Sequence, residues 1–316
     1  MNNLYGKKIF LDNQNSISLL EKLKRNYKDV SMLESVIGGD NKGRFTIIFF
    51  NSFEEIKIYK SHAIENGVEK KFHSHKEYIE NIYNNYKINI YYKEAIPLPI
   101  IIGNLSFDLC KFTLPKLTYN ENKNTIGIPL AHFVKPKNLI IIDNILNQVH
   151  LIDISNNRDK SIKDIEKLKN IINNKKSILK NTKVKSFNKK FKPLMSKKSF
   201  LKKVNLIKNE ITKGEIFQAV LSQRFENDYK IDPFNFYRAL RSINPSPYLV
   251  YLNFSEYQII CSSPETMIKI NDDLVTLRPI AGTRKRGKTK EEDEFNRNEL
   301  LNDKKELAEH LMLVDL

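Results

Sequence analysis

The sequence predicts an α+β fold in which antiparallel sheets are flanked by helices. Two observations favour this class. Between residues 197 and 280 two helical patterns are followed by three or four short strands in a meander, so helices and strands are segregated along the chain. The length of 316 residues, 41% of them hydrophobic, is enough to bury the core of one large domain or of two ordinary ones.

The first half of the chain predicts mainly strands. Runs rich in Ile, Phe and Tyr, such as FTIIFF and EIKIYK, are bounded by turn residues at 38–40 and 65–67. A helical spacing follows over 161–178, with apolar residues at Ile162, Ile165, Leu168, Ile172 and Ile178. The next stretch, KNTKVKSFNKKFKPLMSKKS, is basic and aperiodic. We therefore predict an N-terminal domain over 1–180, a basic linker over 181–198 and a second domain over 199–316.

A helix is predicted over 197–212, from the end of the linker into the second domain, and Gly214 stands after it at a C-cap position. Its apolar face comprises Phe200, Val204, Ile207 and Ile211. The segment IFQAVLSQRF (216–225) then alternates apolar and polar residues, which predicts a strand.

Asp232 and Pro233 predict the start of another helix, which Pro245 ends. The strands of the meander are YLVYLNF, YQIIC, TMIKI and LVTLRPI. A last helix is expected over 304–315, because Asp303 and Glu306 have the spacing of a capping box.

Glu309 lies on this last helix, off the apolar stripe of Leu307, Leu311 and Val314. It is either a solvated helix residue or one ligand of a hard cation such as Mg²⁺, which prefers oxygen. His310 is its neighbour, about 100° further round the helix, and we expect a structural or supporting role for it.

Charge and composition narrow the class of protein. The net charge is +16, but the lysines are dispersed along the whole chain, so we expect no nucleic-acid partner. Two cysteines exclude a disulfide framework and a cysteine-based metal site. The N-terminus lacks the apolar run of a signal peptide, and the most apolar stretch, IPLPIIIGNL, is short and broken by prolines. We expect a cytoplasmic protein without a membrane segment.

The stretch LRPIAGTRKRG (277–287) is a candidate binding corner. Gly282 permits close backbone approach, and turn N–H groups together with the Thr283 hydroxyl can bind an anion. Basic residues around the corner raise the local positive potential: Arg284, Lys285, Arg286 and Lys288. The ligand would be a carboxylate or a phosphate, and the alternative is a solvated hairpin loop.

Five segments in this order and spacing carry a resemblance: GEIFQAVLSQRF, NPSPYLVYL, CSSPETM, RPIAGTRKRGKT and ELAEHLMLVDL. They resemble the large subunits (component I) of anthranilate synthase, in the chorismate-utilising enzyme family. SMLES (31–35) and AIENG (63–67) extend the resemblance more weakly towards the start. It implies the conversion of chorismate and ammonia to anthranilate and pyruvate, the first step of tryptophan biosynthesis. A separate glutamine amidotransferase subunit would supply the ammonia.

The resemblance also implies roles for individual residues. Gly282 and Thr283 match the family's chorismate-binding pair, and Glu309 matches a Mg²⁺ ligand. Tryptophan, as feedback inhibitor, would be bound by Ser35, Pro247, Tyr248 and Leu249, with Glu34 and Arg44 beside them. Relatives that make aminodeoxychorismate commonly carry Lys where this chain has Ala281, so Ala281 favours anthranilate synthase over this alternative.

Members of the family continue past LMLVDL, and the resemblance implies that the further part supplies a second Mg²⁺ carboxylate, a catalytic His and more chorismate contacts. No catalytic residue is identified in this chain. We therefore expect an N-terminal fragment that is inactive alone and that associates or aggregates through exposed apolar edges. The alternative is a non-catalytic remnant or module that binds tryptophan or the amidotransferase.

Overall fold

The computed structural model describes residues 2–10, 15–35, 43–114, 126–174 and 190–315. The chain forms two compact units. The larger unit comprises residues 1–177 and 236–316, and the smaller one comprises 178–235.

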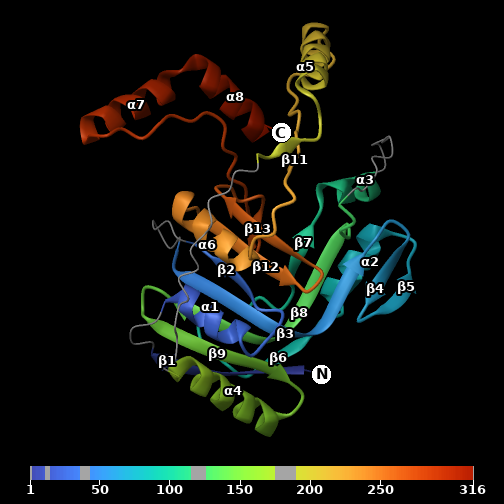
Figure 1. The fold of residues 1–316 in the computed structure, drawn as a ribbon, viewed down its shortest axis with the longest axis vertical. Coiled ribbons are helices and arrows are strands. Elements are labelled where there is room, and N and C mark those ends of the chain that lie inside the picture. Colours follow the sequence, from blue (N-terminus) through green and yellow to red (C-terminus); the bar gives the residue numbers. More distant parts are fainter. Residues whose placement is uncertain (1, 11–14, 36–42, 115–125, 175–189, 316) are drawn as a thin grey trace. The chain divides into compact units, whose positions relative to one another are not determined.

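The larger unit is built on a sheet that has eleven strands within the described residues (Figure 1). Every pair in it is antiparallel except β1 with β6, which confirms the predicted α+β class. The main path runs through β13 (Tyr257–Ser263), β12 (Tyr248–Phe254), β2 (Ser31–Glu34), β3 (Phe45–Ile58), β8 (Ala131–Asp143), β9 (Gln148–Ser155), β1 (Asn2–Phe10) and β6 (Ile88–Ile90). Off this path lie β4 (His62–Glu65), β5 (Val68–Lys71) and β7 (Ile102–Leu105).

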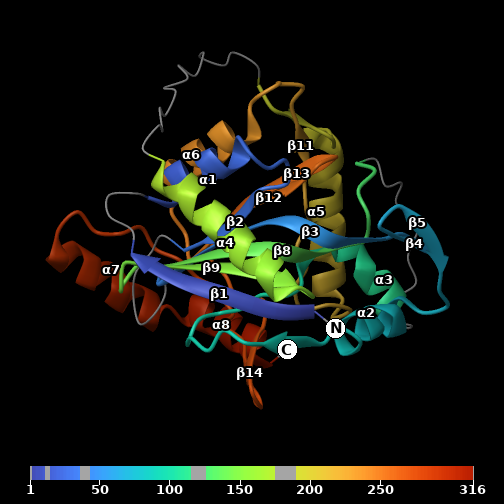
Figure 2. The same cartoon turned by 90° about the horizontal axis from the view of Figure 1, so that it is seen from below.

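Successive side chains of a strand point to opposite faces of a sheet. Most consecutive residues of β8 and β9 are buried, so both faces of the sheet are covered at these strands. Leu139 and Ile141 of β8 belong to a cluster with Phe49, Ile152 and Leu252, against which Tyr92, Ile96 and Leu98 pack. On the other face lie the helices α1 (Ser16–Lys24), α4 (Arg158–Asn173) and α6 (Pro233–Ile243) (Figure 2). The helices α2 (His75–Asn84) and α3 (Cys110–Thr113) and the short 3₁₀ helix η1 (Phe107–Leu109) complete the described helices of the first 177 residues.

Helix α4 shows how a local pattern becomes packing. Asn157 caps its start, since the side-chain oxygen accepts from the Lys160 N–H at 3.0 Å. Ile165, Leu168 and Ile172 are buried as predicted, whereas Ile162 is 48% exposed. Ile178 and the turn expected at 38–40 lie outside the described residues.

The single strand β3 contains the predicted strand FTIIFF and the first four residues of the predicted strand EIKIYK. A bulge between Ser52 and Glu54 separates them, and the Asp29 carboxylate accepts from the Asn51 and Ser52 N–H groups there. The turn predicted at 65–67 is confirmed, because Asn66 and Gly67, with φ of 49° and 83°, connect β4 to β5.

The sheet passes across the domain division predicted from sequence. Strand β12 pairs with β2, with Leu249 opposite Glu34 and Tyr251 opposite Met32. The chain from residue 236 onward thus rejoins the unit of residues 1–177. The division at 180 and 199 stays a prediction, and it does not coincide with these compact units.

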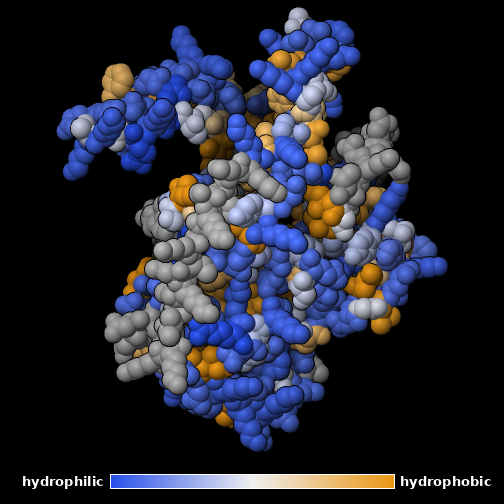
Figure 3. Space-filling view, in the orientation of Figure 1, coloured by the Kyte–Doolittle hydropathy of each residue, from blue (hydrophilic) through white to orange (hydrophobic). Residues whose placement is uncertain are grey.

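The smaller unit contains α5 (Lys197–Thr212), β10 (Lys192–Pro193) and β11 (Phe225–Glu226). Gly214 ends α5 as predicted, at φ 80°, and the Gly214 and Glu215 N–H groups bond back to Ile211 and Glu210. Leu201 and Leu206 of α5 are 50% and 59% exposed. Orange, hydrophobic atoms appear among the blue ones on this helix in Figure 3.

The strand predicted over 216–225 is wrong. Among the residues that the structure describes, only 225–226 form a strand there, paired with 192–193. Phe217 and Val220 are 90% and 91% exposed. Alternation creates an apolar face, but a strand also needs a neighbouring backbone for its hydrogen bonds, and 216–224 pair with no described strand.

The predicted meander begins with β12 and β13 and continues, more briefly than expected, in a separate two-stranded sheet of β14 (Lys269–Asn271) and β15 (Leu274–Thr276). Helices α7 (Lys290–Asn302) and α8 (Lys304–Asp315) follow. Asp303 caps α8 as the capping-box spacing predicted, by accepting from the Glu306 N–H at 3.3 Å. Within the described part of the chain, we find no helix with the length and apolarity needed to cross a membrane.

Candidate functional site

The corner at Gly282 and Thr283 lies against the first turn of α8. A Cβ atom built on Gly282 would stand 2.3 Å from Glu306 Oε2, so a larger residue would displace this carboxylate. The Glu306 carboxylate is in turn held by the Arg284 guanidinium at 3.3 Å. Close approach of backbone to helix, the property expected of Gly282, is therefore present.

The arginines of the corner are engaged with acids. Arg284 pairs with Glu299 at 2.6 Å and with Asp303 at 2.7 Å, and these hydrogen bonds, that with Glu299 first, raise the pKa of its guanidinium. Arg286 pairs with Asp293 at 2.5 Å. The positive potential predicted for this corner is thus largely compensated by α7 and by the start of α8.

A cavity of about 450 Å³ lies beside the corner. It is bounded by the start of β12, the loop after β13, the segment leading to Ala281, and α8. Within the described part of the chain, its lining contains two basic side chains, Arg278 and His310, and no carboxylate; the remaining lining residues are Pro247, Tyr248, Pro264, Thr266, Pro279, Ile280 and Val314. The Tyr248 hydroxyl is hydrogen-bonded to Thr266 Oγ1. The charge of this cavity suits an anion.

Glu309, the predicted Mg²⁺ ligand, stands one turn of α8 after Glu306. Within the described residues, no group of three or more His, Cys, Asp or Glu side chains is placed to hold a metal ion. Mg²⁺ can be held by one or two carboxylates and several waters, so the role of Glu309 stays a prediction.

A second cavity, of about 350 Å³, lies at the end of β2. Its lining includes Glu34 and Ser35, and the other residues are Asn15, Ser16, Gly43, Thr46, Ile142, Asn144 and Arg241. The Ser35 hydroxyl is buried and has no hydrogen-bond partner among the described residues. A buried donor without a partner costs about 1–3 kcal/mol, so this hydroxyl is suited to a ligand's polar group.

The Glu34 carboxylate, only 2% exposed, is the buried anion of this cavity. It accepts from Ser16 Oγ at 3.0 Å, from the Tyr237 hydroxyl, and from Arg241 Nε at 2.6 Å. Burial raises the pKa of Tyr237, and so do the charge of Glu34 and the hydrogen bond between Tyr237 and Glu34. The phenol therefore keeps its proton and donates a hydrogen bond to Glu34.

Arg44, predicted beside the same site, forms an ion pair with Asp143. Its guanidinium lies 2.7 Å from Asp143 Oδ2, and Asp143 is buried. Burial alone would raise the pKa of Asp143, but the hydrogen bonds from Arg44 and from the Leu146 and Ile145 N–H groups outweigh it and lower the pKa. Arg44 therefore neutralises a buried carboxylate.

The predicted tryptophan-binding residues are thus distributed over two cavities. Glu34 and Ser35 line the cavity at the end of β2, and Pro247 and Tyr248 line the one beside the Gly282 corner. Leu249 connects them, because it stands directly opposite Glu34 in the β2–β12 pair.

Sequence reasoning did not identify Tyr237 and Arg241. The available signal was their spacing of four residues, which puts both on one face of the predicted helix before NPSPY. Nothing in the sequence shows that this face meets Glu34, some 207 residues away.

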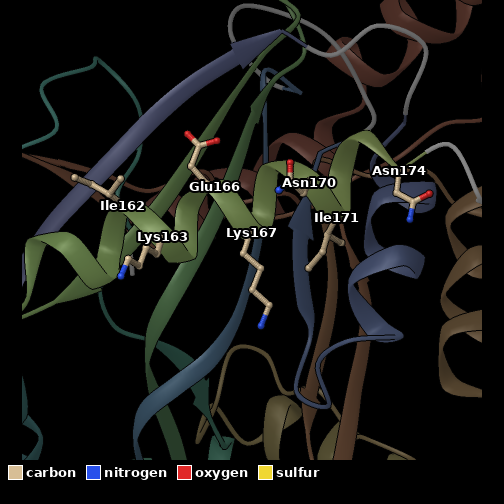
Figure 4. Close-up of a pocket in the computed structure, with 7 residues that line it drawn as sticks. All are labelled: Ile162, Lys163, Glu166, Lys167, Asn170, Ile171 and Asn174. Atoms are coloured by element: carbon tan, nitrogen blue, oxygen red, sulfur yellow. The ribbon is translucent and has the colours of Figure 1, made fainter.

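A further hollow, of about 560 Å³, follows the outside of α4. Its lining is Ile162, Lys163, Glu166, Lys167, Asn170, Ile171 and the C-cap Asn174. Figure 4 shows Glu166 pointing away from Lys167, so these side chains do not converge on a ligand. We regard it as an ordinary helix surface.

Residues 34–316 match the family model of the chorismate binding enzyme. The chain belongs to the chorismate-binding enzyme family. The Gly282 corner and all lining residues of the two cavities except Asn15 and Ser16 lie within the matched residues.

Relatives of this chain include anthranilate synthase component 1 of Acetivibrio thermocellus, 36% identical over 98% of this chain and 65% of the relative. The corresponding protein of Aquifex aeolicus is 33% identical over 98% of this chain and 64% of the relative. Among solved structures, anthranilate synthase component I from Streptococcus pneumoniae superposes with a TM-score of 0.70 at 29% identity, covering 89% of this chain and 62% of that one. The chain thus spans about 60–65% of the length of the curated relatives it matches.

The menaquinone-specific isochorismate synthase from Escherichia coli shares the fold, with a TM-score of 0.55 at 12% identity. It covers 99% of this chain and 62% of that one. At this identity the likeness extends to the fold alone.

Proposed function

We propose that this protein acts as the chorismate-converting component of anthranilate synthase. It would form anthranilate and pyruvate from chorismate and ammonia, with the ammonia supplied from glutamine by an amidotransferase partner. Support comes from the similarity of 98% of the chain to proteins that carry the name anthranilate synthase component 1.

The observation that carries the proposal is the cavity beside Gly282 and Thr283. Its described lining residues include two basic side chains, Arg278 and His310, and no carboxylate, and chorismate is a dicarboxylate. Gly282 and Thr283 follow the lining residue Ile280 by two and three positions but do not line the cavity themselves. A carboxylate of the ligand would reach the N–H groups and the Thr283 hydroxyl of this turn from beside Ile280.

Ala281 supports ammonia as the nucleophile. Its methyl side chain cannot attack chorismate, so an external amine must add directly, whereas a lysine there would offer a covalent route. This residue favours anthranilate synthase over aminodeoxychorismate synthase.

Feedback inhibition by tryptophan is the second part of the proposal. The cavity at the end of β2 offers two groups to the polar end of an amino acid. These are the buried Glu34 carboxylate and the Ser35 hydroxyl, which has no hydrogen-bond partner among the described residues. Its volume of about 350 Å³ lies at the lower end of the usual range for small-molecule sites.

The test uses the native protein, isolated from the cells that make it, with chorismate, an ammonium salt and Mg²⁺. We expect anthranilate and pyruvate in equal amounts, identified by chromatography, and a loss of the reaction on chelation of the metal or addition of L-tryptophan. Formation of aminodeoxychorismate or isochorismate instead would refute the proposed reaction. Turnover that L-tryptophan does not change would refute the proposed regulation alone.

A further inference from the structure

The Glu34 carboxylate is already paired with a cation of the protein itself. Arg241 reaches across from α6 and donates from Nε at 2.6 Å and from Nη2 at 3.4 Å. An ammonium group of a ligand would need the space that this guanidinium fills. Any amino acid that binds Glu34 through its ammonium group must therefore move Arg241.

The two partners of this ion pair differ in exposure. The Glu34 side chain is 2% exposed, whereas that of Arg241 is 33% exposed and lines the cavity. Glu34 also keeps Ser16 and Tyr237 as donors when the guanidinium leaves. Arg241 is accordingly the partner that can move, and Glu34 is the one that stays.

Among the described residues that line the cavity, Glu34 is the one anion and Arg241 the one cation, and the others are neutral. This charge pattern is complementary to a zwitterion, which presents an ammonium and a carboxylate a few bonds apart. Arg44 does not compete for the carboxylate, because the buried Asp143 holds it. An arginine fork is well suited to a carboxylate, which it can bind through two parallel hydrogen bonds.

We propose that Arg241 occupies the ammonium position on Glu34 in the effector-free protein and that an aromatic α-amino acid displaces it. The ligand ammonium group then binds Glu34, and the released guanidinium binds the ligand carboxylate. This inference rests on the proposed feedback function and assigns its recognition to an exchange of ion pairs.

The residue that moves in this exchange of ion pairs, Arg241, is followed in the chain by residues that line the cavity beside Gly282. Arg241 lies in the last turn of α6, and the corner of residues 244–247 follows it at once. Ser262 Oγ fixes this corner by donating to the Asn244 carbonyl at 2.6 Å, and Pro247 and Tyr248 line the cavity beside Ile280. A displaced Arg241 would thus act on the element that borders the proposed chorismate cavity.

The test compares two ligands on three forms of the native protein: unchanged, Arg241→Gln and the control Arg238→Gln on the same helix. The ligands are L-tryptophan and tryptamine, which lacks the carboxylate. These 316 residues contain no tryptophan, so they add no indole fluorescence to that of a bound ligand.

We expect Arg241→Gln to weaken L-tryptophan binding by about tenfold or more, because a charge-assisted contact is lost. The same variant should bind tryptamine as tightly as the unchanged protein or more tightly, because Glu34 no longer carries a competing guanidinium. Arg238→Gln should change neither affinity. This opposite response of the two ligands would not arise from a purely structural role of Arg241.

Equal weakening of both ligands by Arg241→Gln, no change in either, or failure of the unchanged protein to bind either ligand would overturn the inference. If Arg241→Gln does not fold, Arg241→Lys replaces it: we expect weaker L-tryptophan binding and unchanged tryptamine binding, since lysine keeps the charge but loses the fork. Binding as expected in a protein that makes no anthranilate would leave this inference standing and refute the proposed reaction.

Discussion

Gly282 shows how one residue without a side chain can determine the shape of a site. Its backbone lies where any Cβ would meet the Glu306 carboxylate, and this carboxylate belongs to the set of acids that holds Arg284. The proposed anion contacts at Thr283 depend on this close approach. Gly282 therefore contributes to the site by allowing the backbone to lie close to Glu306, and it supplies no side-chain group of its own.

Replacing Gly282 with alanine should lower kcat/KM for chorismate by about 100-fold, because displacement of the corner by roughly an ångström misplaces the substrate. Steady-state anthranilate formation measures this effect. Gly214→Ala is the matched control: at φ 80° with nothing within 4 Å of its Cβ, it should cost about 1 kcal/mol of stability and leave turnover unchanged. Equal effects of the two variants on turnover would contradict the role given to Gly282.

At the scale of helices and strands, local sequence signals such as capping residues predicted the bounds of single helices. Helices α5 and α8 were predicted with the bounds that the structure shows, because capping residues at Gly214 and Asp303 mark one end of each. The strand at 216–225 failed, since alternation carries no information about a pairing partner. The contact of Arg241 with Glu34 could not be predicted for the same reason, because it depends on the pairing of β2 with β12, two strands far apart in sequence.

The hairpin of β12 and β13 is fixed to the rest of the sheet by a buried histidine. His132 of β8 is fully buried, stacks on Phe254 at 3.9 Å, and bonds through its two nitrogens to the Tyr257 hydroxyl at 2.8 Å and to Glu55 at 2.9 Å. Lys57 and Glu256 are the other charges that act on it. Burial lowers the pKa of His132, and the opposing effect of Glu55 does not restore it.

This shift predicts a pH dependence of stability. The unfolded chain binds a proton at His132 near pH 6.5, whereas the folded protein resists protonation to lower pH. Its contribution is therefore fully present above about pH 6.5 and is lost as the pH falls towards the lowered pKa.

Urea unfolding at about pH 7.5 and 5.5 measures this loss. His132→Gln should lose less unfolding free energy between these pH values than the unchanged protein, at a cost of about 1–3 kcal/mol at the higher pH. His150, whose pKa burial also lowers, is expected to account for part of what remains. An identical pH dependence in the two proteins would contradict the assignment to His132.

At the scale of the molecule, residues 1–177 and 236–316 form one compact unit although 58 residues of the other unit separate them in sequence. The pairing of β2 with β12 extends the first segment's sheet with strands of the second. Both proposed sites depend on this return of the chain, because α6, β12 and α8 all come from the second segment.

Hydrogen exchange should therefore find β2, β3 and β12 opening with roughly the same free energy, that of cooperative unfolding of the larger unit. The exposed ends of α5 and of the β14–β15 hairpin should exchange at much lower cost. Exchange through β12 and β13 at a free energy well below that of β3 would show that residues 236–316 fold as a separate domain.

The most direct test of the central claim is a crystal structure of the native protein with chorismate, prepared without ammonium so that turnover stops. We predict chorismate in the cavity lined by Tyr248, Ile280 and His310, with a carboxylate against Gly282 and Thr283. Chorismate bound away from this corner, or a saturating concentration that leaves the cavity without ligand, would contradict the account.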